Sequence, residues 1–173
     1  MRPIPSLLLL LCLLQGCRKD PPTVVDLEID GLTYRDMNAD VFCLPDSTDW
    51  QLLDQWDEWE SSLFAGRPTG PAAVSAPDTF LFFAFPNPSV YGWQIHTNQN
   101  STSYFDMRIV NRQREILWSQ NNITGNSVYL SPTSIAFSPD SSELVRAYYR
   151  VMRSNGTVYQ GHGDLKRAAF SCP

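Results

Sequence analysis

Alternating apolar and polar positions run through the second half of the chain and predict a series of short β-strands. In the clearest run, Phe105, Met107 and Ile109 alternate with polar neighbours. Turn-forming residues separate the runs, so strands are expected at 79–85, 91–95, 104–109, 115–120, 127–130, 134–137, 144–152 and 157–160. This succession of short strands and turns predicts a mostly β protein with a β-sandwich fold.

A helical period replaces the alternation between residues 49 and 64. Apolar side chains recur there at steps of three and four residues, at Leu52, Leu53, Trp56, Trp59 and Leu63. Thr48 and Gln51 match a capping box, so one amphipathic helix is expected. The tryptophans of this segment admit two interpretations, a platform for a stacked ligand or side chains that pack the helix onto a sheet. Their helical spacing favours packing.

Residues 24–34 contain two β-rich runs on either side of Asp30-Gly31, a strong short-range signal for a hairpin turn. The same stretch has the acidic spacing that opens a calcium-binding loop. Such a loop needs a glutamate at its twelfth position, where this chain has Met37. We therefore expect a hairpin here and no metal site.

The first residues have the layout of an export signal. Arg2 precedes an apolar run over residues 4–14. Gln15 and the small residue Gly16 follow the run and precede Cys17. The run is too short for the roughly 20 residues that a membrane-spanning helix needs. The order Leu14-Gln15-Gly16-Cys17 resembles a bacterial lipobox.

The lipobox resemblance implies a lipid-anchored precursor. Residues 1–16 would be a lipoprotein signal peptide, and Cys17 would be lipidated and become the first mature residue. Residues 17–23 would then be a short tether that holds the protein to the membrane. The residue directly after the cysteine is Arg18 and not the aspartate of a retention signal, which favours the cell outer membrane.

The chain is acidic, with 13 Lys and Arg against 18 Asp and Glu and a formal net charge of −5. Loss of Arg2 with the signal would make the remaining domain more acidic still. A negatively charged domain gains nothing electrostatically from phosphates, so no nucleic-acid partner is expected.

Two cysteines are left for folding once Cys12 leaves with the signal and Cys17 is lipidated. In an exported protein, Cys43 and Cys172 then predict a disulfide. It would close a loop of about 130 residues and stabilise the fold by roughly 4–5 kcal/mol. The alternative is two buried thiols that never meet.

The segment Phe85-Pro86-Asn87-Pro88, followed by Tyr91-Gly92-Trp93, resembles the opening of the immunoglobulin-like C-terminal domains of secreted Bacteroidota proteins. The resemblance implies an immunoglobulin-like β-sandwich over residues 79–173, preceded by a hairpin-plus-helix segment at 24–78. Those domains commonly act as sorting signals at the extreme C-terminus. Here further residues follow and Cys17 supplies another export route, so the resemblance carries the fold and not the sorting role.

The sequence carries little that indicates catalysis. It has no nucleophile elbow and no phosphate-binding glycine loop. His162 and Asp164 suggest half of a catalytic pair, for which Ser134 is a candidate nucleophile. A histidine bonded locally at a strand end is the simpler interpretation, so no catalytic residue and no cofactor is expected.

Two non-enzymatic functions follow from these features. The first is an accessory outer-membrane lipoprotein that contacts another envelope protein through its immunoglobulin-like domain. The second is a surface module that binds carbohydrate, with sugars stacked on Tyr91, Trp93, Tyr104 and Trp118. Aromatic residues at alternating strand positions more often build a core, which makes the first function the leading expectation.

Overall fold

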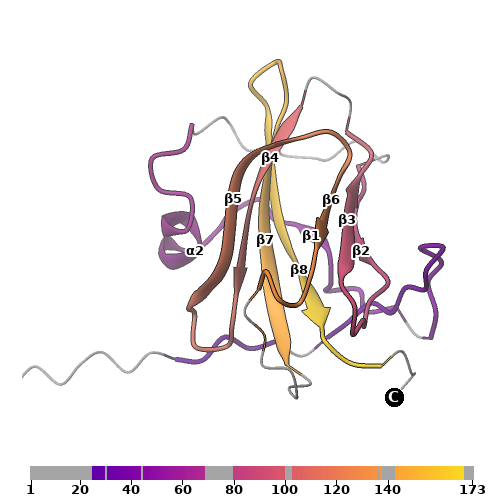
Figure 1. Cartoon of the computed structure of the whole chain (residues 1–173). Coiled ribbons are helices and arrows are strands. Elements are labelled where there is room, and N and C mark those ends of the chain that lie inside the picture. The colour runs from indigo at the N-terminus through magenta and orange to yellow at the C-terminus, as the bar shows by residue number, and fades with distance from the viewer. Residues whose placement is uncertain are drawn as a thin grey trace, which may run out of the picture.

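The computed structural model describes residues 25–29, 31–43, 45–68, 80–99, 103–135, 137 and 143–169. These residues form two antiparallel sheets and one short helix, which confirms the predicted mostly β fold and the β-sandwich (Figure 1). The elements are β1 (Gln51–Leu52), α2 (Glu58–Ser62), β2 (Phe82–Phe85), β3 (Trp93–Thr97), β4 (Tyr104–Val110), β5 (Ile116–Thr124), β6 (Ser127–Leu130), β7 (Leu144–Met152) and β8 (Val158–Lys166).

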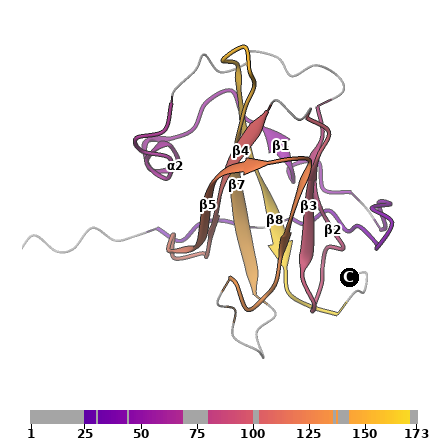
Figure 2. The same ribbon diagram turned by 45° about the horizontal axis from the view of Figure 1, so that its top comes forward.

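The larger sheet has five strands in the order β1-β8-β7-β4-β5, and the smaller sheet has three in the order β2-β3-β6. The two sheets face each other across the core (Figure 2). Strand β5 is an edge strand, and its pairing with β4 is interrupted by two register shifts. Asn122 of β5 has a left-handed backbone, with φ of 54°.

The inner face of the larger sheet and the inner face of the smaller sheet make one apolar core. Phe105, Met107 and Ile109 of β4 are each at most 1 % exposed, and Trp93 of β3 is fully buried. Phe82 of β2 stacks on Tyr149 of β7 with ring centroids 3.8 Å apart, which joins the two sheets. The period-two alternation of the sequence therefore points its apolar set between the sheets.

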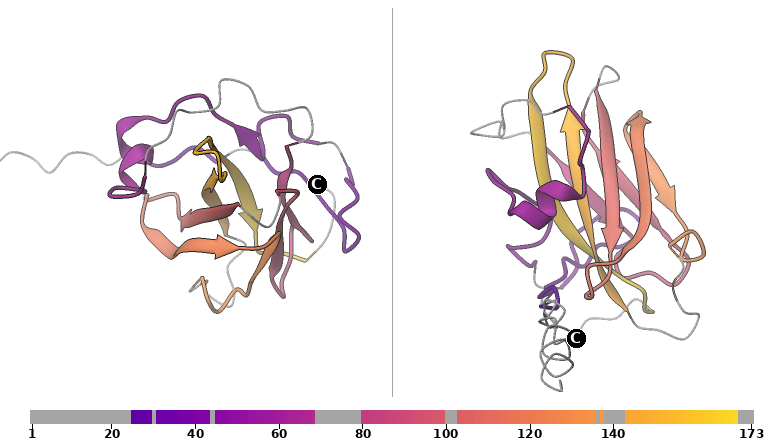
Figure 3. Two further views of the ribbon diagram at one scale, coloured as in Figure 1. Left: turned by 90° about the horizontal axis from the view of Figure 1, so that it is seen from above. Right: turned by 90° about the vertical axis from the view of Figure 1, so that its left-hand side faces the viewer.

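The outer face of the larger sheet is covered by the N-terminal part of the chain, which includes α2 (Figure 3). Leu63 and Phe64, just after α2, pack on Val110 of β4 and Tyr148 of β7. Between these apolar contacts the outer face carries charged side chains that are also buried, namely Asp106, Arg108, Arg150 and Asp164. The N-terminal segment is thus a second layer on one sheet and also supplies β1 to it.

The predicted helix over residues 49–64 is wrong in its first part, because α2 spans Glu58–Ser62. The helix starts at Asp57, whose side chain and that of Glu60 form a capping box in place of Thr48 and Gln51. Upstream, Gln51 and Leu52 pair with β8 as β1. Trp50 has a left-handed φ of 57°, which a helix does not allow.

Trp50 packs into the core beside β8. Its ring occupies the space where a Cβ on Gly163 would lie, and it stacks on Phe82 at 6.0 Å and on Tyr149 at 6.3 Å. Trp50 therefore packs against the core of the sandwich, whereas Trp56 and Trp59, which belong to the predicted helical pattern, pack against the outer cluster.

The hairpin predicted at residues 24–34 is not formed by the described residues 25–29 and 31–34, which contain no strand. Side-chain acceptors take the place of a partner strand there, since the Thr33 N–H donates to Asp49 Oδ2 at 2.6 Å. Gly31 serves close approach instead of a turn, because a Cβ at this position would overlap the Asp46 carboxylate. The short antiparallel bridge lies further on, between Arg35 and Val41.

Most of the remaining strand predictions are confirmed. The bounds of β6 and β7 are those expected, and β8 runs six residues beyond the predicted end at residue 160. The strand predicted at 134–137 is wrong for the described residues there, since Ser134 and Ile135 lie in a turn closed by hydrogen bonds to Ser131 and Pro132.

Candidate functional site

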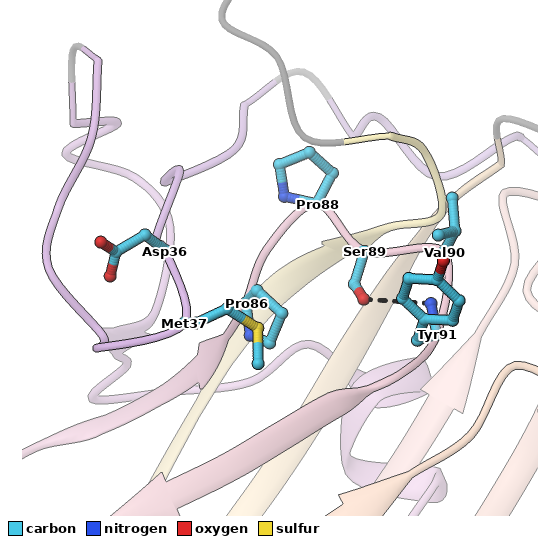
Figure 4. Close-up of a pocket in the computed structure, with 7 residues that line it drawn as sticks. All are labelled: Asp36, Met37, Pro86, Pro88, Ser89, Val90 and Tyr91. Atoms are coloured by element: carbon cyan, nitrogen blue, oxygen red, sulfur yellow. Dashed lines mark hydrogen bonds between the residues drawn. The ribbon is translucent and has the colours of Figure 1, made fainter.

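An apolar groove lies where the connection after β2 meets the turn at residues 36–37. Its cavity volume is about 300 Å³. Figure 4 shows Met37 beside Pro86 and, further along the same loop, Ser89 and Tyr91. The groove is lined by Asp36, Met37, Pro86, Pro88, Ser89, Val90 and Tyr91.

Asn87 holds in place the loop that carries the lining residues Pro86 and Pro88. Its side chain is fully buried, donates from Nδ2 to the carbonyl of Asp164 at 2.7 Å, and accepts at Oδ1 from the Lys166 N–H at 3.1 Å. Its backbone exchanges two hydrogen bonds of 2.9 Å with Arg35. The Pro-Asn-Pro segment thus ties β8 to the N-terminal turn, a role of the asparagine that the sequence does not reveal.

Local hydrogen bonds shape both walls of the groove. Asp36 Oδ1 accepts from the N–H groups of Asn38 (2.8 Å) and Asp40 (3.0 Å), which closes the turn that carries Met37. On the other wall, Ser89 Oγ accepts from the N–H groups of Tyr91 and Gly92, both at 3.2 Å. Both walls are therefore formed before any ligand arrives.

The rim of the groove is unusually apolar for exposed surface. Met37 is 74 % exposed and Tyr91 is 84 % exposed, and Val90 between them is partly exposed. Tyr129 of β6 adjoins the rim, because its hydroxyl donates to the Tyr91 carbonyl at 2.8 Å. Exposed apolar side chains gathered at a concave surface are typical of a contact site.

The four aromatic residues considered for sugar stacking are not brought onto one face. Tyr91 lies at the groove, whereas Trp93 is fully buried and packs on Phe137. Trp118 of β5 is partly buried against the core. Tyr104 is the first residue of β4 and is paired with Met152. Of the four, Tyr91 presents its ring to solvent.

His162, Asp164 and Ser134 are likewise not assembled into one cleft. Asp164 forms an ion pair with Arg146, with Oδ1 2.8 Å from Nε. Burial and then the nearby Arg146 lower the pKa of His162 to about 4, so its imidazole is neutral at pH 7. Ser134 follows β6 of the other sheet, and its hydroxyl donates to the Ser131 carbonyl at 2.7 Å.

Asp49 is a buried acid that the sequence does not single out. It accepts from the Thr33 N–H and from the Asp164 N–H, both at 2.6 Å, and so joins the N-terminal segment to β8. Burial outweighs these hydrogen bonds and raises the pKa of Asp49 to about 7. Within the described residues its contacts are structural.

Cys17 and Cys172 lie outside the described residues. Cys43 is described and is disulfide-bonded, but a bond to Cys172 in particular stays a prediction. In the described part of the chain no helix has the length and apolar character needed to cross a membrane. No group of three or more His, Cys, Asp or Glu that could hold a metal ion occurs among the described residues.

Comparisons with protein-family models, with curated proteins and with solved structures gave no match for this chain.

Proposed function

We propose that this protein is a non-enzymatic, lipid-anchored envelope protein that uses the apolar groove to contact another envelope protein. The observation that carries the proposal is the groove itself, with one wall held by the hydrogen bonds of Asn87 and an exposed apolar rim at Met37 and Tyr91. Preformed concave surfaces of this kind lose little conformational entropy on binding.

The chemistry of the groove indicates what kind of partner segment would bind there. The lining is apolar except for Asp36 and Ser89, and the chain as a whole is acidic. An apolar segment of the partner would fill the space between Met37 and Tyr91, and a lysine or arginine beside that segment would meet Asp36. A flexible methionine and an aromatic ring adapt well to such a segment.

The anchor and the fold complete the proposal. The lipobox resemblance supports lipidation of Cys17 and attachment to the outer membrane. The Pro-Asn-Pro segment supports an immunoglobulin-like sandwich of the kind found on secreted Bacteroidota proteins. A disulfide between Cys43 and Cys172 would suit the oxidising compartment that such an anchor implies.

Site-specific photo-crosslinking in the native cell tests the proposal. A photoreactive phenylalanine analogue at position 37 should capture a defined protein band in the envelope fraction. The same analogue at Ile116, an exposed apolar residue of β5 outside the groove, is the matched control. The combined Met37→Ser and Tyr91→Ser variant should also fail to retain that band in a mild-detergent pull-down.

Two outcomes contradict a groove-mediated contact. One is equal crosslinking from positions 37 and 116, and the other is full retention of the partner by the groove variant. A Cys17→Ala variant separates the contribution of the anchor from that of the groove.

The exposed ring of Tyr91 supports carbohydrate binding as a second candidate function. A glycan array with the purified protein tests it, with Tyr91→Ser as the matched variant. Binding that depends on Tyr91, together with no captured protein, would move the function from a protein partner to a sugar.

A further inference from the structure

A second cavity lies between the outer face of the larger sheet and the segment around α2. Its volume is about 220 Å³. It is lined by Trp56, Ser61, Phe64, Ala65, Gly66, Arg67, Arg150 and Gln160. We call it the arginine cavity, and none of its lining residues belongs to the apolar groove.

The strand register explains why charged groups meet here. Asp106 of β4, Arg150 of β7 and Gln160 of β8 lie in one row across the sheet, because 106 pairs with 150 and 150 pairs with 160. All three point to the outer face, where Arg67 and Phe64 cover them. Arg108, next on the outer face of β4, stacks its guanidinium on the Phe64 ring at 4.7 Å.

Positive charge exceeds negative charge at this place. Asp106 is bound by Arg67, with Nε to Oδ2 at 2.7 Å, and its Oδ1 also accepts from the Asn122 N–H. Arg108 and Arg150 donate to neutral acceptors, among them the carbonyls of Leu63 and Pro68. Among the described residues here, three guanidinium groups thus lie near one carboxylate, and one of the three is bound to it.

The excess of positive charge affects the pKa of the arginines. Burial lowers the pKa of both Arg108 and Arg150, Asp106 opposes that change, and Arg67 adds to it. In a chain with a net charge of −5, such a local excess of positive charge is a departure from the overall balance.

Two of the residues that line the cavity each carry a donor atom without a hydrogen-bond partner. Arg150 Nε and Trp56 Nε1 are buried and make no hydrogen bond. Arg150 is 7 % exposed and these two atoms are almost closed to water, so a ligand in the cavity would meet the amino groups of Arg150 and the ring of Trp56 instead.

We propose that the arginine cavity binds an oxyanion group, a carboxylate or a phosphate, carried by a small acidic ligand. The oxygens would accept hydrogen bonds from the amino groups of Arg150. Arg67, whose Nε and one amino group already donate to Asp106, would add its positive charge. Ser61 and Gln160 add polar contacts, and the rings of Trp56 and Phe64 offer an apolar wall to the rest of the ligand. A cavity of about 220 Å³ has room for several water molecules and so admits a phosphate or a single acidic sugar.

Nuclear magnetic resonance of the indole N–H groups tests this inference on the full chain in mild detergent. The probes are inorganic phosphate and glucuronate, with glucose as the neutral match for glucuronate. Phosphate, glucuronate or both should move the Trp56 indole signal to saturation while glucose does not. The Trp59 signal, from a ring that stacks with Arg114 outside the cavity, should stay in place.

Variants decide which groups are responsible. Arg150→Gln, which removes the guanidinium, should weaken binding at least tenfold by calorimetry. An unchanged indole signal of the core residue Trp93 reports that each variant is folded. The groove variant Met37→Ser should bind the anion as the wild type does, which keeps this inference separate from the proposed function.

Three results would overturn the inference. They are no saturable shift with either anion, an equal shift with glucose, and an Arg150→Gln protein that binds as tightly as the wild type. If one anion alone saturates the site, it identifies the source of the oxyanion group as phosphate or as carboxylate.

Discussion

The two faces of the five-stranded sheet are both buried, yet they are buried by different chemistry. On the inner face of β4, Phe105, Met107 and Ile109 meet apolar side chains of the other sheet. On the outer face of the same strand, Asp106 and Arg108 are 1 % and 6 % exposed and meet hydrogen-bonding groups. The inner face needs volume to be filled, whereas the outer face needs each polar group to be matched by a partner.

The N-terminal segment is what makes the outer face possible. It brings Asp49 to the N–H of Asp164, Arg67 to Asp106, and the carbonyl of Leu63 to Arg108. Polar matching is specific to position, so this layer tolerates fewer arrangements than an apolar core would. Buried donors without a hydrogen-bond partner occur on both sides of the sheet, at Arg150 and Trp56 in this layer and at Trp50 and Trp93 in the core.

Removal of a large side chain from the inner face should produce the largest loss of stability. Trp93→Ala is expected to lower the free energy of unfolding by about 3–5 kcal/mol, because the cavity left in the core cannot collapse fully. Urea unfolding measures this loss. Gln94→Ala, on the other face of β3, is the control and should change stability by about 0.5 kcal/mol or less. A loss below about 1 kcal/mol for Trp93→Ala would contradict the assigned core.

Removal of one charge from the outer face should come next. Asp164→Asn is expected to cost about 2–4 kcal/mol, because it leaves the guanidinium of Arg146 buried without its carboxylate. The combined Arg146→Met and Asp164→Leu variant should recover most of that loss, since two apolar groups need no partner. If the combined variant is as unstable as the single one, the outer face depends on the ion pair itself. The claim that it needs only matched polar groups would then be wrong.

The pH dependence of stability should expose two opposing groups, His162 of β8 and Asp49, which accepts a hydrogen bond from the backbone of β8. Asp49 has its pKa raised to about 7, so the folded state gives up stability as pH rises from about 4 to 7. His162 has its pKa lowered to about 4, so the folded state gives up stability as pH falls from about 6.5 to 4. Between pH 4 and 6.5 the two slopes oppose each other, each at about 1.4 kcal/mol per pH unit.

Single variants separate these two slopes. Relative to the wild type, Asp49→Asn should become less stable as pH falls from 6.5 to 4.5, and His162→Gln should become less stable as pH rises over the same range. Urea unfolding at three pH values measures both. Parallel pH profiles for the two variants would show that neither group is buried as described.

Substitution at the rim of the apolar groove should have the smallest effect on stability. Tyr91→Ser removes a ring that is 84 % exposed, so the free energy of unfolding should change by about 0.5 kcal/mol or less. Thermal unfolding provides the measurement. A larger loss would mean that the ring is a packing element, and it would weaken the case for Tyr91 as a contact residue.

Alternation predicted best those strands in which the side chains packed in the core recur with the same period of two as the sequence pattern. For β6 and β7 the predicted bounds were correct, because period-two patterning and burial agree there. Around Trp50 reasoning from the helical period failed, since tryptophans that are close in the sequence can pack in two different layers. The competing capping box at Asp57 and the glycine-lined space at Gly163 depend on tertiary structure, and no local window contains both.

The candidate sites were predictable only in part. The Pro-Asn-Pro segment and Tyr91 stand out in the sequence, but the turn that carries Met37 is about fifty residues away and meets them through Arg35 and Asn87. The arginine cavity has no local signal at all. Arg67 and Arg150 come together through strand register and the path of the N-terminal segment, which a single sequence does not specify.

The irregular pairing of β5 has a consequence for the protein at high local concentration. A long, regular edge strand offers a row of open N–H and C=O groups on which a second chain can add, the first step toward fibrils. The register shifts along β5 and the left-handed Asn122 break that row, and exposed Ser119, Gln120 and Asn121 keep it polar. Many copies crowded at one surface would therefore remain separate instead of joining edge to edge.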